Sequence, residues 1–586
     1  MMISYRIRPN FAALLVFAWA LVAVWLLTQF WTSAATVITD PDDAMRLSQV
    51  REFLAGKSWF DLAEPRVDPP YGYLTHWSRL IDLGLAGLFM LARLFFDAPM
   101  AERVMIEVWP VLWLLPAMGG VAAIAWRCGG RDAALAALVL AVFGLPAFQH
   151  FQPGRIDHHN VQIALAILTV AAAAWSDRVN CASVAAGLLS ALALAVGLES
   201  LPWIVLAGAA IALRFIANGT AAGGLRGYGI ALAGGTLALF VATVGPAHWL
   251  VSVCDALAVN LALPVVIAGA ILAFGSTLSA QASFAVRLGV VAAGAVIAGA
   301  IFMSAEPACI YGPYALVDPA VKQAWLSHVE EMSPLVGVLR TAPLSGVWVA
   351  AFPCAALLVS AILASTTLRR DFAFLLAVAA LLIAAILTLA MVKTYSYAMW
   401  FGMPVVAVGI ARFCAQLKLS KALSAPVALV LTPVMISAGA ISIAQAAAVV
   451  APLQPSSKRE ACFRIDAYAP LEKIPSGLIV ANVDFGPALL AFTGHAVLAA
   501  PYHRISHGIL TAQRIFSSSP GEAKKLLAET HAVYVVLCGT SRPTGLDDAA
   551  LKVGFWAGLT TGEIPGWLER VPLPDSSPFV VYRVKS

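Results

Sequence analysis

Apolar segments of about 20 residues recur along this sequence from residue 11 to about residue 450. A helix of that length can cross the hydrocarbon core of a bilayer, which is roughly 30 Å thick. Only 12% of the 586 residues are charged and the mean hydropathy is +0.84, whereas about a quarter of the residues in soluble domains are charged. The sequence therefore predicts an α-helical polytopic membrane protein and excludes an ordinary soluble fold.

The first apolar segment, Phe11 to Phe30, follows a basic stretch with Arg6 and Arg8. It is longer than the roughly 7–15-residue apolar part of a signal peptide, and further apolar segments follow it, so we predict that it is retained as a span. Because Lys and Arg collect in cytoplasmic loops, Arg6 and Arg8 place the N-terminus inside. The net charge of +5 lies mostly in short loops, so it reports topology and not nucleic-acid binding.

The other basic loops orient the remaining spans. Threading the chain so that basic loops such as those at Arg127, Arg178, Arg369 and Lys418 lie inside gives about thirteen crossings and an outside C-terminus. The predicted crossings are residues 11–30, 106–126, 133–150, 161–176, 182–198, 201–217, 228–246, 257–275, 284–303, 346–366, 371–391, 396–413 and 424–449.

This threading leaves the long loops outside, at residues 32–101 and 304–345. The apolar stretch 80–97, which Asp82 and Arg93 interrupt, is then expected to lie in the membrane interface without crossing. We expect the protein in a bacterial inner membrane, with these loops and the C-terminal region on the periplasmic side.

The composition changes after Ala451. Strand-like runs alternate with helical patterns there, which predicts a soluble α/β domain at residues 451–586 beside a membrane domain at residues 1–450. Most cysteines lie in or beside apolar spans, where a free Cys acts as a small apolar residue. Cys462 and Cys538 instead lie in this C-terminal region, where spacing alone leaves their pairing open. The predicted strands are Gly477–Val483, His495–Ala499, Ala532–Cys538 and Pro578–Val584, and the predicted helices are Ser519–Thr530 and Asp547–Trp556.

The first outside loop begins with an acidic motif, Asp40-Pro41-Asp42-Asp43. Its carboxylates repel one another unless a cation or a basic partner neutralises them. Asp40 before Pro41 is also a good helix start, and the two roles are compatible. We predict a catalytic or metal-binding role for Asp40 or Asp43.

The second motif, Arg155-Ile156-Asp157-His158-His159-Asn160, lies between two predicted spans. Ionisable residues are costly at a bilayer boundary, so they indicate function there. Asp157 and His159 share a side of an extended or turn backbone. Carboxylate and imidazole ligands bind divalent cations, and Mg²⁺ or Mn²⁺ is often shared with phosphate oxygens. The two motifs predict a metal site that handles a lipid phosphate.

Further candidates lie on the same predicted face. Glu330 and Glu331 occupy a loop in which acidic pairs are often merely solvated. His76 and Arg79 lie in an aromatic and basic cluster that an interfacial belt would also explain. Lys393 stands outside against the charge bias, which favours a phosphate-facing role.

With these motifs the chain resembles, over nearly its whole length, the catalytic subunit of oligosaccharyltransferases of the archaeal and bacterial single-subunit type, a branch of the GT-C glycosyltransferases. Asp40-Pro41 with Arg46 resembles the family's first acidic motif, and Asp157-His158-His159 resembles its second. The resemblance implies thirteen spans, an outside C-terminal α/β domain, and metal ligands at Asp40, Asp157 and His159.

The resemblance also implies roles for two later segments. His328 to Pro334 is similar to a family loop whose Glu contacts the metal and helps to activate the acceptor, and Glu331 fits that position better than Glu330. At the position of the family's phosphate-holding Arg this chain has Tyr397. Lys393 lies four residues earlier, on the same helical face, and is expected to substitute.

The C-terminal domain departs from the family. The family reads an asparagine sequon with Trp-Trp-Asp-Tyr-Gly, but the similar segment here, Ala481 to Gly486 with Asp484, has no tryptophan. We therefore expect no efficient transfer to Asn-x-Ser/Thr peptides. Tyr502, His503 and Arg504 occupy the place where family members approach the membrane site, and together with Asp484 they are the acceptor-side candidates.

The expected function is metal-assisted transfer of a sugar or oligosaccharide from a polyprenyl-phosphate or -diphosphate donor to a protein, lipid or polysaccharide acceptor. One alternative is a GT-C enzyme that adds a monosaccharide to a lipid or envelope polysaccharide without metal. A transporter of lipid-linked saccharides is a further alternative, but transporters place ionisable residues near the bilayer midplane, and here they gather on one face.

Overall fold

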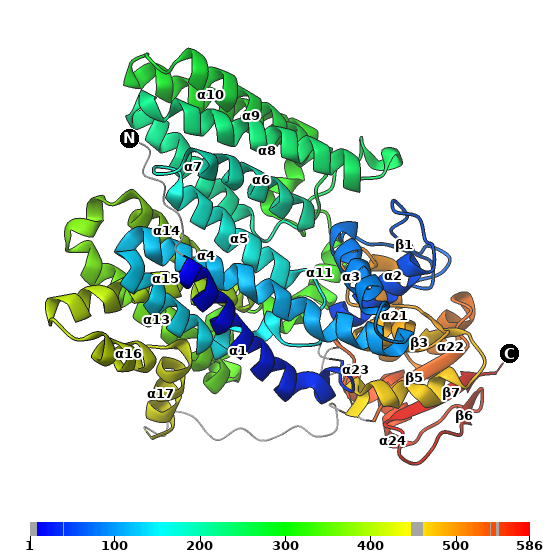
Figure 1. Cartoon of the computed structure of the whole chain (residues 1–586). Helices are drawn as coiled ribbons and strands as arrows, with labels where there is room; N and C mark the ends of the chain where they lie inside the picture. Colours follow the sequence, from blue (N-terminus) through cyan, green and yellow to red (C-terminus); the bar gives the residue numbers. More distant parts are fainter. Residues whose placement is uncertain (1–8, 39, 447–460, 540, 547–549, 586) are drawn as a thin grey trace.

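The computed structural model describes residues 9–585 apart from residues 39, 447–460, 540 and 547–549 (Figure 1). A large helical part carries the N-terminal residues, and a smaller part with a β-sheet carries the C-terminus. The predicted boundary between the two domains, at residue 450, lies outside the described residues. The predicted fold class, an α-helical membrane protein with a C-terminal α/β domain, is confirmed.

Each predicted crossing lies on a helix. Within the described residues, eight helices are long and apolar enough to cross a membrane, and the bent pair α16–α17 makes a ninth if it is counted as one span. Two predicted crossings lie on α4, which Gly130 interrupts with a φ of +74°, and three lie on the shorter helices α5, α6 and α7. The helices that carry the predicted crossings are α1 (Pro9–Ala34), α4 (Ala98–Val142), α5 (His159–Trp175), α6 (Asn180–Val196), α7 (Leu201–Ala217), α8 (Ala222–Thr243), α9 (Val259–Leu278), α10 (Phe284–Ala305), α13 (Pro343–Ala364), α14 (Phe372–Ala390), α15 (Tyr395–Gln416), α16 (Lys421–Val430) and α17 (Pro433–Ala446).

Loops predicted to lie inside meet one another. The Arg127 guanidinium contacts Asp177, which precedes α6, and Asp371, which caps α14; its Nε lies 3.1 Å from Asp177 Oδ1 and its Nη1 lies 3.3 Å from Asp371 Oδ2. These ion pairs join three loops that the charge pattern assigns to one side. The acidic motifs gather elsewhere, beside the C-terminal domain.

Helix α3 (Arg79–Ala92) covers most of the stretch predicted to lie in the interface. Its 14 residues are too few for a span, which needs about 20. Ile81 and Leu85 are buried, whereas Leu83, Met90 and Leu91 are exposed. One apolar face packs on the protein and another stays uncovered, as expected of a helix that lies in an interface.

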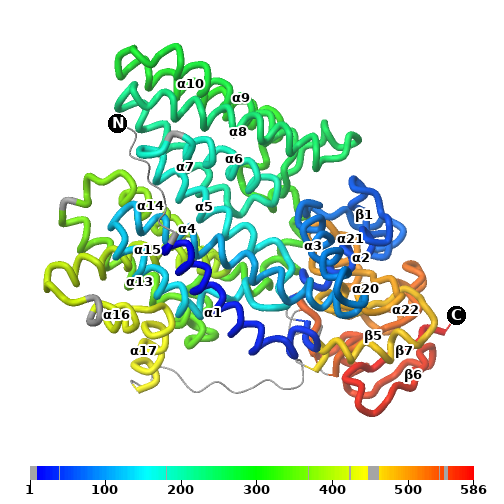
Figure 2. The backbone as a smooth tube through the Cα atoms, in the orientation of Figure 1, coloured from blue at the N-terminus to red at the C-terminus, as the bar shows by residue number. Residues whose placement is uncertain are grey.

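The first outside loop docks on the C-terminal domain, as Figure 2 shows for the blue and orange segments. Helix α2 (Pro41–Leu54) packs against α20 (Gly486–Phe492). Val67 forms a parallel bridge with Val497, and the neighbouring backbone donates from Asp68 N to Val497 O at 2.8 Å. The loop thereby holds the two domains together and fixes the position of the first acidic motif.

The C-terminal sheet has five strands in the order β4-β3-β5-β7-β6. β3, β4 and β5 are parallel, whereas β7 and β6 run antiparallel to their neighbours. The four predicted strands are present, but the edge strand β6 was not predicted. The predicted helices correspond to α22 (Pro520–Glu529) and, where described, to α23 (Ala550–Val553) and α24 (Phe555–Thr561). The strands are β3 (Leu478–Val480), β4 (Ala496–Val497), β5 (Tyr534–Cys538), β6 (Leu568–Val571) and β7 (Phe579–Val584).

The described part of the chain has two disulfides, and all four of their cysteines lie outside the predicted spans. Cys462 and Cys538 are bonded within the C-terminal domain, which answers the question that their spacing left open. Cys254 and Cys309 join the loop between α8 and α9 to the segment after α10. The sequence analysis missed this bond because it treated both cysteines as small apolar residues.

Candidate functional site

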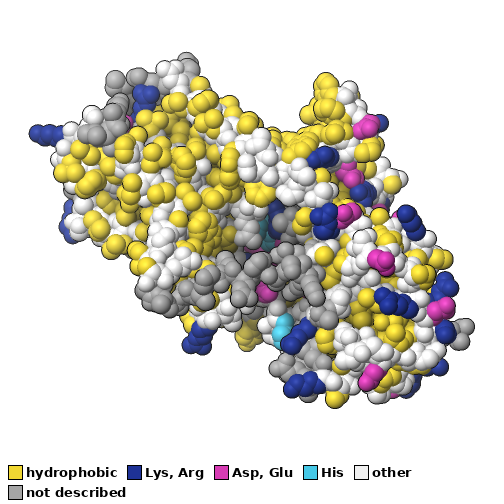
Figure 3. All heavy atoms as spheres, turned by 90° about the horizontal axis from the view of Figure 1, so that it is seen from below, with side chains coloured by type: hydrophobic (Ala, Val, Ile, Leu, Met, Phe, Trp, Pro, Cys, Tyr) yellow, Lys and Arg dark blue, Asp and Glu magenta, His cyan; other side chains and the backbone are white. Residues whose placement is uncertain are grey.

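A cavity of about 1180 Å³ lies where the helical part meets the C-terminal domain. Figure 3 shows this region as a hollow between a surface rich in hydrophobic side chains and one on which charged side chains are interspersed. The described residues that line the cavity include Asp40, Asp42, His76, His158, His159, Glu199, Glu330, Glu331, Lys393, Asp484, Tyr502 and His503.

Arg155 joins the two acidic motifs. Its guanidinium Nη1 lies 2.8 Å from Asp40 Oδ2, its Nη2 lies 2.5 Å from Asp157 Oδ2, and its Nε lies 3.4 Å from Asp43 Oδ2. Asp43 also accepts hydrogen bonds from the backbone N–H groups of Ile156 and Asp157, at 2.8 and 3.0 Å. Although the motifs are more than a hundred residues apart, they form one network.

The carboxylates of this network differ in access to the cavity. Asp40 lines the cavity and is 30% exposed, whereas Asp43 and Asp157 are buried behind it. Asp157 uses its second oxygen to accept from the His159 N–H at 2.9 Å. Burial is the largest single influence and raises the pKa of Asp157, but the positive charge of Arg155 and the nearby histidines together hold this pKa below its ordinary value.

Asp42 also lines the cavity and was not singled out from the sequence. Burial, followed by the negative charges of Asp40, Glu331 and Asp157, raises its pKa well above the ordinary value. The neutral, protonated form of Asp42 is therefore favoured on the cavity side of the first motif.

Glu199 is the main residue that the sequence analysis missed. It stands between α6 and α7, accepts from Lys393 Nζ at 2.7 Å, and contacts His159 Nδ1 at 3.0 Å. Lys393 Nζ also lies 3.9 Å from Glu331. The sequence did carry a signal for Glu199, because an ionisable residue between two apolar segments indicates function. Together Glu199, His159, Lys393 and Glu331 form a second network, on the cavity wall.

The cavity offers carboxylate and imidazole groups suited to a divalent cation, and one compact group of them includes the predicted ligand His159. His158, His159 and Glu199 have ligand atoms within 4.8 Å of one another. The predicted set of Asp40, Asp157, His159 and Glu331 does not form such a group in the described part of the chain. His158 Nδ1 is buried and has no hydrogen-bond partner among the described residues. Carboxylates outnumber Lys and Arg around the cavity, and a cation would offset that excess.

Only two of the four predicted phosphate-binding residues line the cavity. Lys393 and His76 line the cavity. Arg79 instead is buried, donates to Asp82 at 2.8 Å, and shares that carboxylate with Arg46. Tyr397 is also buried and stacks on Trp203 with ring centroids 4.1 Å apart. Arg79 and Tyr397 are absent from the cavity lining.

Three of the four acceptor-side candidates, Asp484, Tyr502 and His503, line the same cavity. Asp484 accepts from the Thr544 hydroxyl at 2.9 Å, and both residues line the cavity. The Tyr502 ring stacks on Tyr73 at 5.0 Å. His503 lines the cavity, whereas Arg504 turns away to bind Asp255.

No protein-family model matches the sequence, and no curated protein matches it. Among solved structures, the chain is similar to the oligosaccharyltransferase AglB of Archaeoglobus fulgidus in complex with an inhibitory peptide and a dolichol-phosphate. The TM-score is 0.64 at 13% identity, over 89% of this chain and 69% of that chain. The apo form of the archaeal enzyme gives a TM-score of 0.62 at 15% identity, over 90% and 70%. Its complex with Zn and sulfate gives 0.58 at 15% identity, over 89% and 67%. At such identities the likeness establishes architecture, and this chain shares the overall fold of the archaeal enzyme.

Proposed function

We propose that this protein is a membrane glycosyltransferase. It transfers a sugar or oligosaccharide from a polyprenyl-phosphate or -diphosphate donor to an acceptor on the outer face of a bacterial inner membrane. The observation that carries the proposal is the cavity that Lys393 lines together with the carboxylates Asp40 and Glu331, at the junction of membrane helices and C-terminal domain. A structure of the archaeal enzyme of similar fold is a complex with a dolichol-phosphate, a lipid of the class proposed here for the donor.

The chemistry divides between two groups of residues. As the bond from the sugar C1 to the donor phosphate breaks, the phosphate leaves with the electron pair and gains charge, which Lys393 stabilises. The acceptor nucleophile forms the new bond to C1 and gives its proton to a carboxylate, for which Asp40 and Glu331 are the candidates. Tyr502, His503 and Asp484 line the same cavity and would orient the acceptor.

A divalent cation, Mg²⁺ or Mn²⁺, would be held by His158, His159 and Glu199 and would supply Lewis-acid stabilisation of the leaving phosphate. One structure of the archaeal enzyme of similar fold is a complex with Zn and sulfate, which supports testing for a divalent cation here. One observation favours the metal-free alternative, in which the enzyme adds a monosaccharide to a lipid or polysaccharide. Arg155 already pairs with Asp40, Asp43 and Asp157, so those acids need no metal.

The proposed orientation rests on two observations. Disulfides persist in oxidising compartments such as the periplasm. Cys254–Cys309 and Cys462–Cys538 both belong to the side that the basic loops assign to the outside. Cysteine labelling from outside at the exposed positions 323 and 520 tests this. Protection of both positions in intact cells, with labelling only after permeabilisation, contradicts the orientation.

The activity test uses the purified full-length protein and polyprenyl-linked donors that carry a labelled sugar. We expect release of labelled sugar from the lipid, and loss of that release in Lys393→Ala but not in Lys525→Ala, an exposed lysine on α22. Running both proteins with and without chelator separates the metal-assisted mechanism from the metal-free one. Donors that stay intact under all conditions refute the transferase proposal.

A peptide assay tests the acceptor. Because Ala481 to Gly486 has no tryptophan, we expect no efficient transfer to an Asn-x-Ser/Thr peptide. Transfer to a lipid or polysaccharide fraction in the same assay supports the proposed change of acceptor. Robust glycosylation of the peptide contradicts it.

A further inference from the structure

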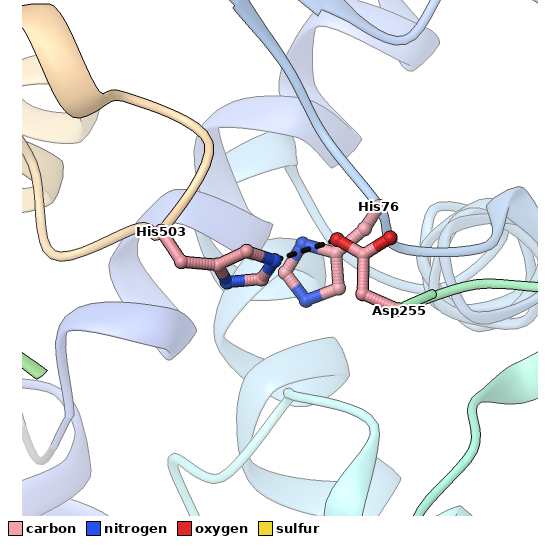
Figure 4. Close-up of side chains that lie close together, drawn as sticks. All are labelled: His76, Asp255 and His503. Atoms are coloured by element: carbon pink, nitrogen blue, oxygen red, sulfur yellow. Dashed lines mark hydrogen bonds and ion pairs between the residues drawn. The ribbon is translucent and has the colours of Figure 1, made fainter. Parts of the chain in front are cut away.

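A second group of possible metal ligands lies where three distant segments meet. His76 precedes α3 in the first outside loop, Asp255 lies in the loop between α8 and α9, and His503 precedes α21 (Ser506–Ser517) in the C-terminal domain. One ligand atom from each lies within 4.8 Å of the other two. Figure 4 shows the two imidazole rings and the carboxylate directed toward one another.

We propose that His76, Asp255 and His503 bind a zinc-class divalent cation that ties the C-terminal domain to the membrane domain. Two imidazoles and one carboxylate form a ligand set typical of Zn²⁺ sites that keep an open position. His76 and His503 both line the large cavity, so the open position would face it. The site shares no residue with His158, His159 and Glu199, and the proposal does not depend on transferase activity.

His76 has a ring nitrogen that the described protein leaves unsatisfied. Its Nδ1 atom is buried and has no hydrogen-bond partner among the described residues. Buried polar atoms are nearly always satisfied, and an unsatisfied one calls for an explanation such as an ion. His503 Nε2 already lies 2.6 Å from Asp255 Oδ2, so a cation would need only a small separation of these two groups to join all three ligands.

The surroundings hold Asp255 in place from two directions. Arg504 donates from Nε and Nη2 to the two oxygens of Asp255, at 2.7 and 2.6 Å. Second-shell contacts of this kind orient carboxylate ligands in metal sites. The preceding residue, Cys254, is bonded to Cys309, which anchors the loop. The positive charge of Arg504 also lowers cation affinity, so we expect exchangeable binding that a chelator removes.

The competing explanation is an ion-pair clamp in which His503 and Arg504 hold Asp255 without a metal. His76 separates the two explanations because the hydrogen bonds and ion pairs of the clamp join Asp255 to His503 and Arg504 only, within the described residues. Replacing it removes a metal ligand while leaving the pairs of Asp255 with His503 and Arg504 intact.

The experiment uses full-length protein in detergent, stripped with a chelator and then equilibrated with Co²⁺ or Zn²⁺ alone. Bound metal is measured by mass spectrometry, and Co²⁺ also by its visible absorption. We expect His76→Gln, His503→Gln and Asp255→Asn each to lose one bound cation per chain relative to wild type. Glu199→Gln should keep that cation, since it belongs to the other group.

His507→Gln is the matched control. His507 lies 2.9 Å from Asp68 in a second His–Asp pair and belongs to neither three-residue group. We expect its cation content to equal that of wild type. The proposal is overturned if folded His76→Gln retains the wild-type cation content, or if Asp255→Asn lowers the melting temperature without losing a cation. Either result leaves the clamp as the sole role of the cluster.

Discussion

The two charged networks of the cavity differ in how completely the protein satisfies them. Arg155 is 4% exposed and contacts three carboxylates, two of which are buried. Lys393 is 15% exposed and contacts Glu199, and its more distant partner Glu331 is 47% exposed. Breaking a buried ion pair is strongly destabilising, whereas ion pairs open to solvent contribute little to stability. We therefore assign Arg155 and the buried Asp43 and Asp157 to scaffolding, and the Lys393 network to substrate binding, with Asp40 at the cavity edge between them.

The largest expected effect is on stability, from Arg155→Ala. It leaves Asp43 and Asp157 buried without their cation, and breaking a buried pair in this way costs about 3–5 kcal/mol. Thermal unfolding in detergent should show a large fall in melting temperature. Arg178→Ala, at a half-exposed arginine on the opposite side, is the control. An unchanged melting temperature for Arg155→Ala would remove the distinction between the networks.

The second-largest expected effect is a loss of activity in Lys393→Ala. Removing a positioned charge from the leaving phosphate should lower the rate of donor cleavage by about 10²–10³-fold. Because Lys393 is partly exposed, the melting temperature should change little. A fall in stability comparable to that of Arg155→Ala would show that Lys393 is a scaffold residue too.

A smaller effect concerns Glu64, a buried carboxylate outside both networks. It accepts no hydrogen bond within the described residues, and Arg66 Nε is 3.6 Å away. Burial, followed by the neighbouring Glu52, raises the pKa of Glu64 from 4.5 to about 7. A raised pKa means that folding favours the protonated acid, so stability should fall as the pH rises from 4.5 through 7.

Glu64→Gln should remove that pH dependence and stabilise the protein at pH 8 by about 1–2 kcal/mol. The free energy of unfolding at pH 5 and pH 8 measures this pH dependence. Glu529→Gln, at an exposed position on α22, is the control. A pH dependence shared equally by wild type and Glu64→Gln would assign the effect to another group.

The smallest effect is expected for Tyr397→Phe. The Tyr397 hydroxyl is buried, has no hydrogen-bond partner among the described residues, and is absent from the cavity lining. Replacing an unsatisfied buried polar group by an apolar one of the same shape is nearly neutral. Donor cleavage should stay within about twofold of wild type. A loss as large as that of Lys393→Ala would restore Tyr397 as a phosphate ligand.

The fold followed from the sequence because apolar length and basic loops are local signals. Each predicted span lies on a helix, and Asp40 caps α2 by accepting from the Asp42 N–H at 3.0 Å, as Asp40-Pro41 predicted. The edge strand β6 was missed because only its first residue, Leu568, is buried, so it lacks a clear alternation of buried and exposed positions.

The site was less predictable because pairing between distant residues decides it. Asp157 has the residue type of a metal ligand, but Arg155 and the His159 N–H already occupy its oxygens. Arg79 has the residue type of a phosphate ligand, but Asp82 neutralises it in the interior. Glu199 was overlooked as a lone residue, and its importance comes from the lysine 194 positions later in the chain.

The most direct test is an experimental structure of the full-length protein with a polyprenyl phosphate. We predict that the phosphate lies within hydrogen-bond distance of Lys393, while Arg155 keeps its contacts with Asp40 and Asp157. A phosphate bound to a released Arg155, or bound outside the cavity, would contradict the division between a scaffolding network and a substrate-binding network.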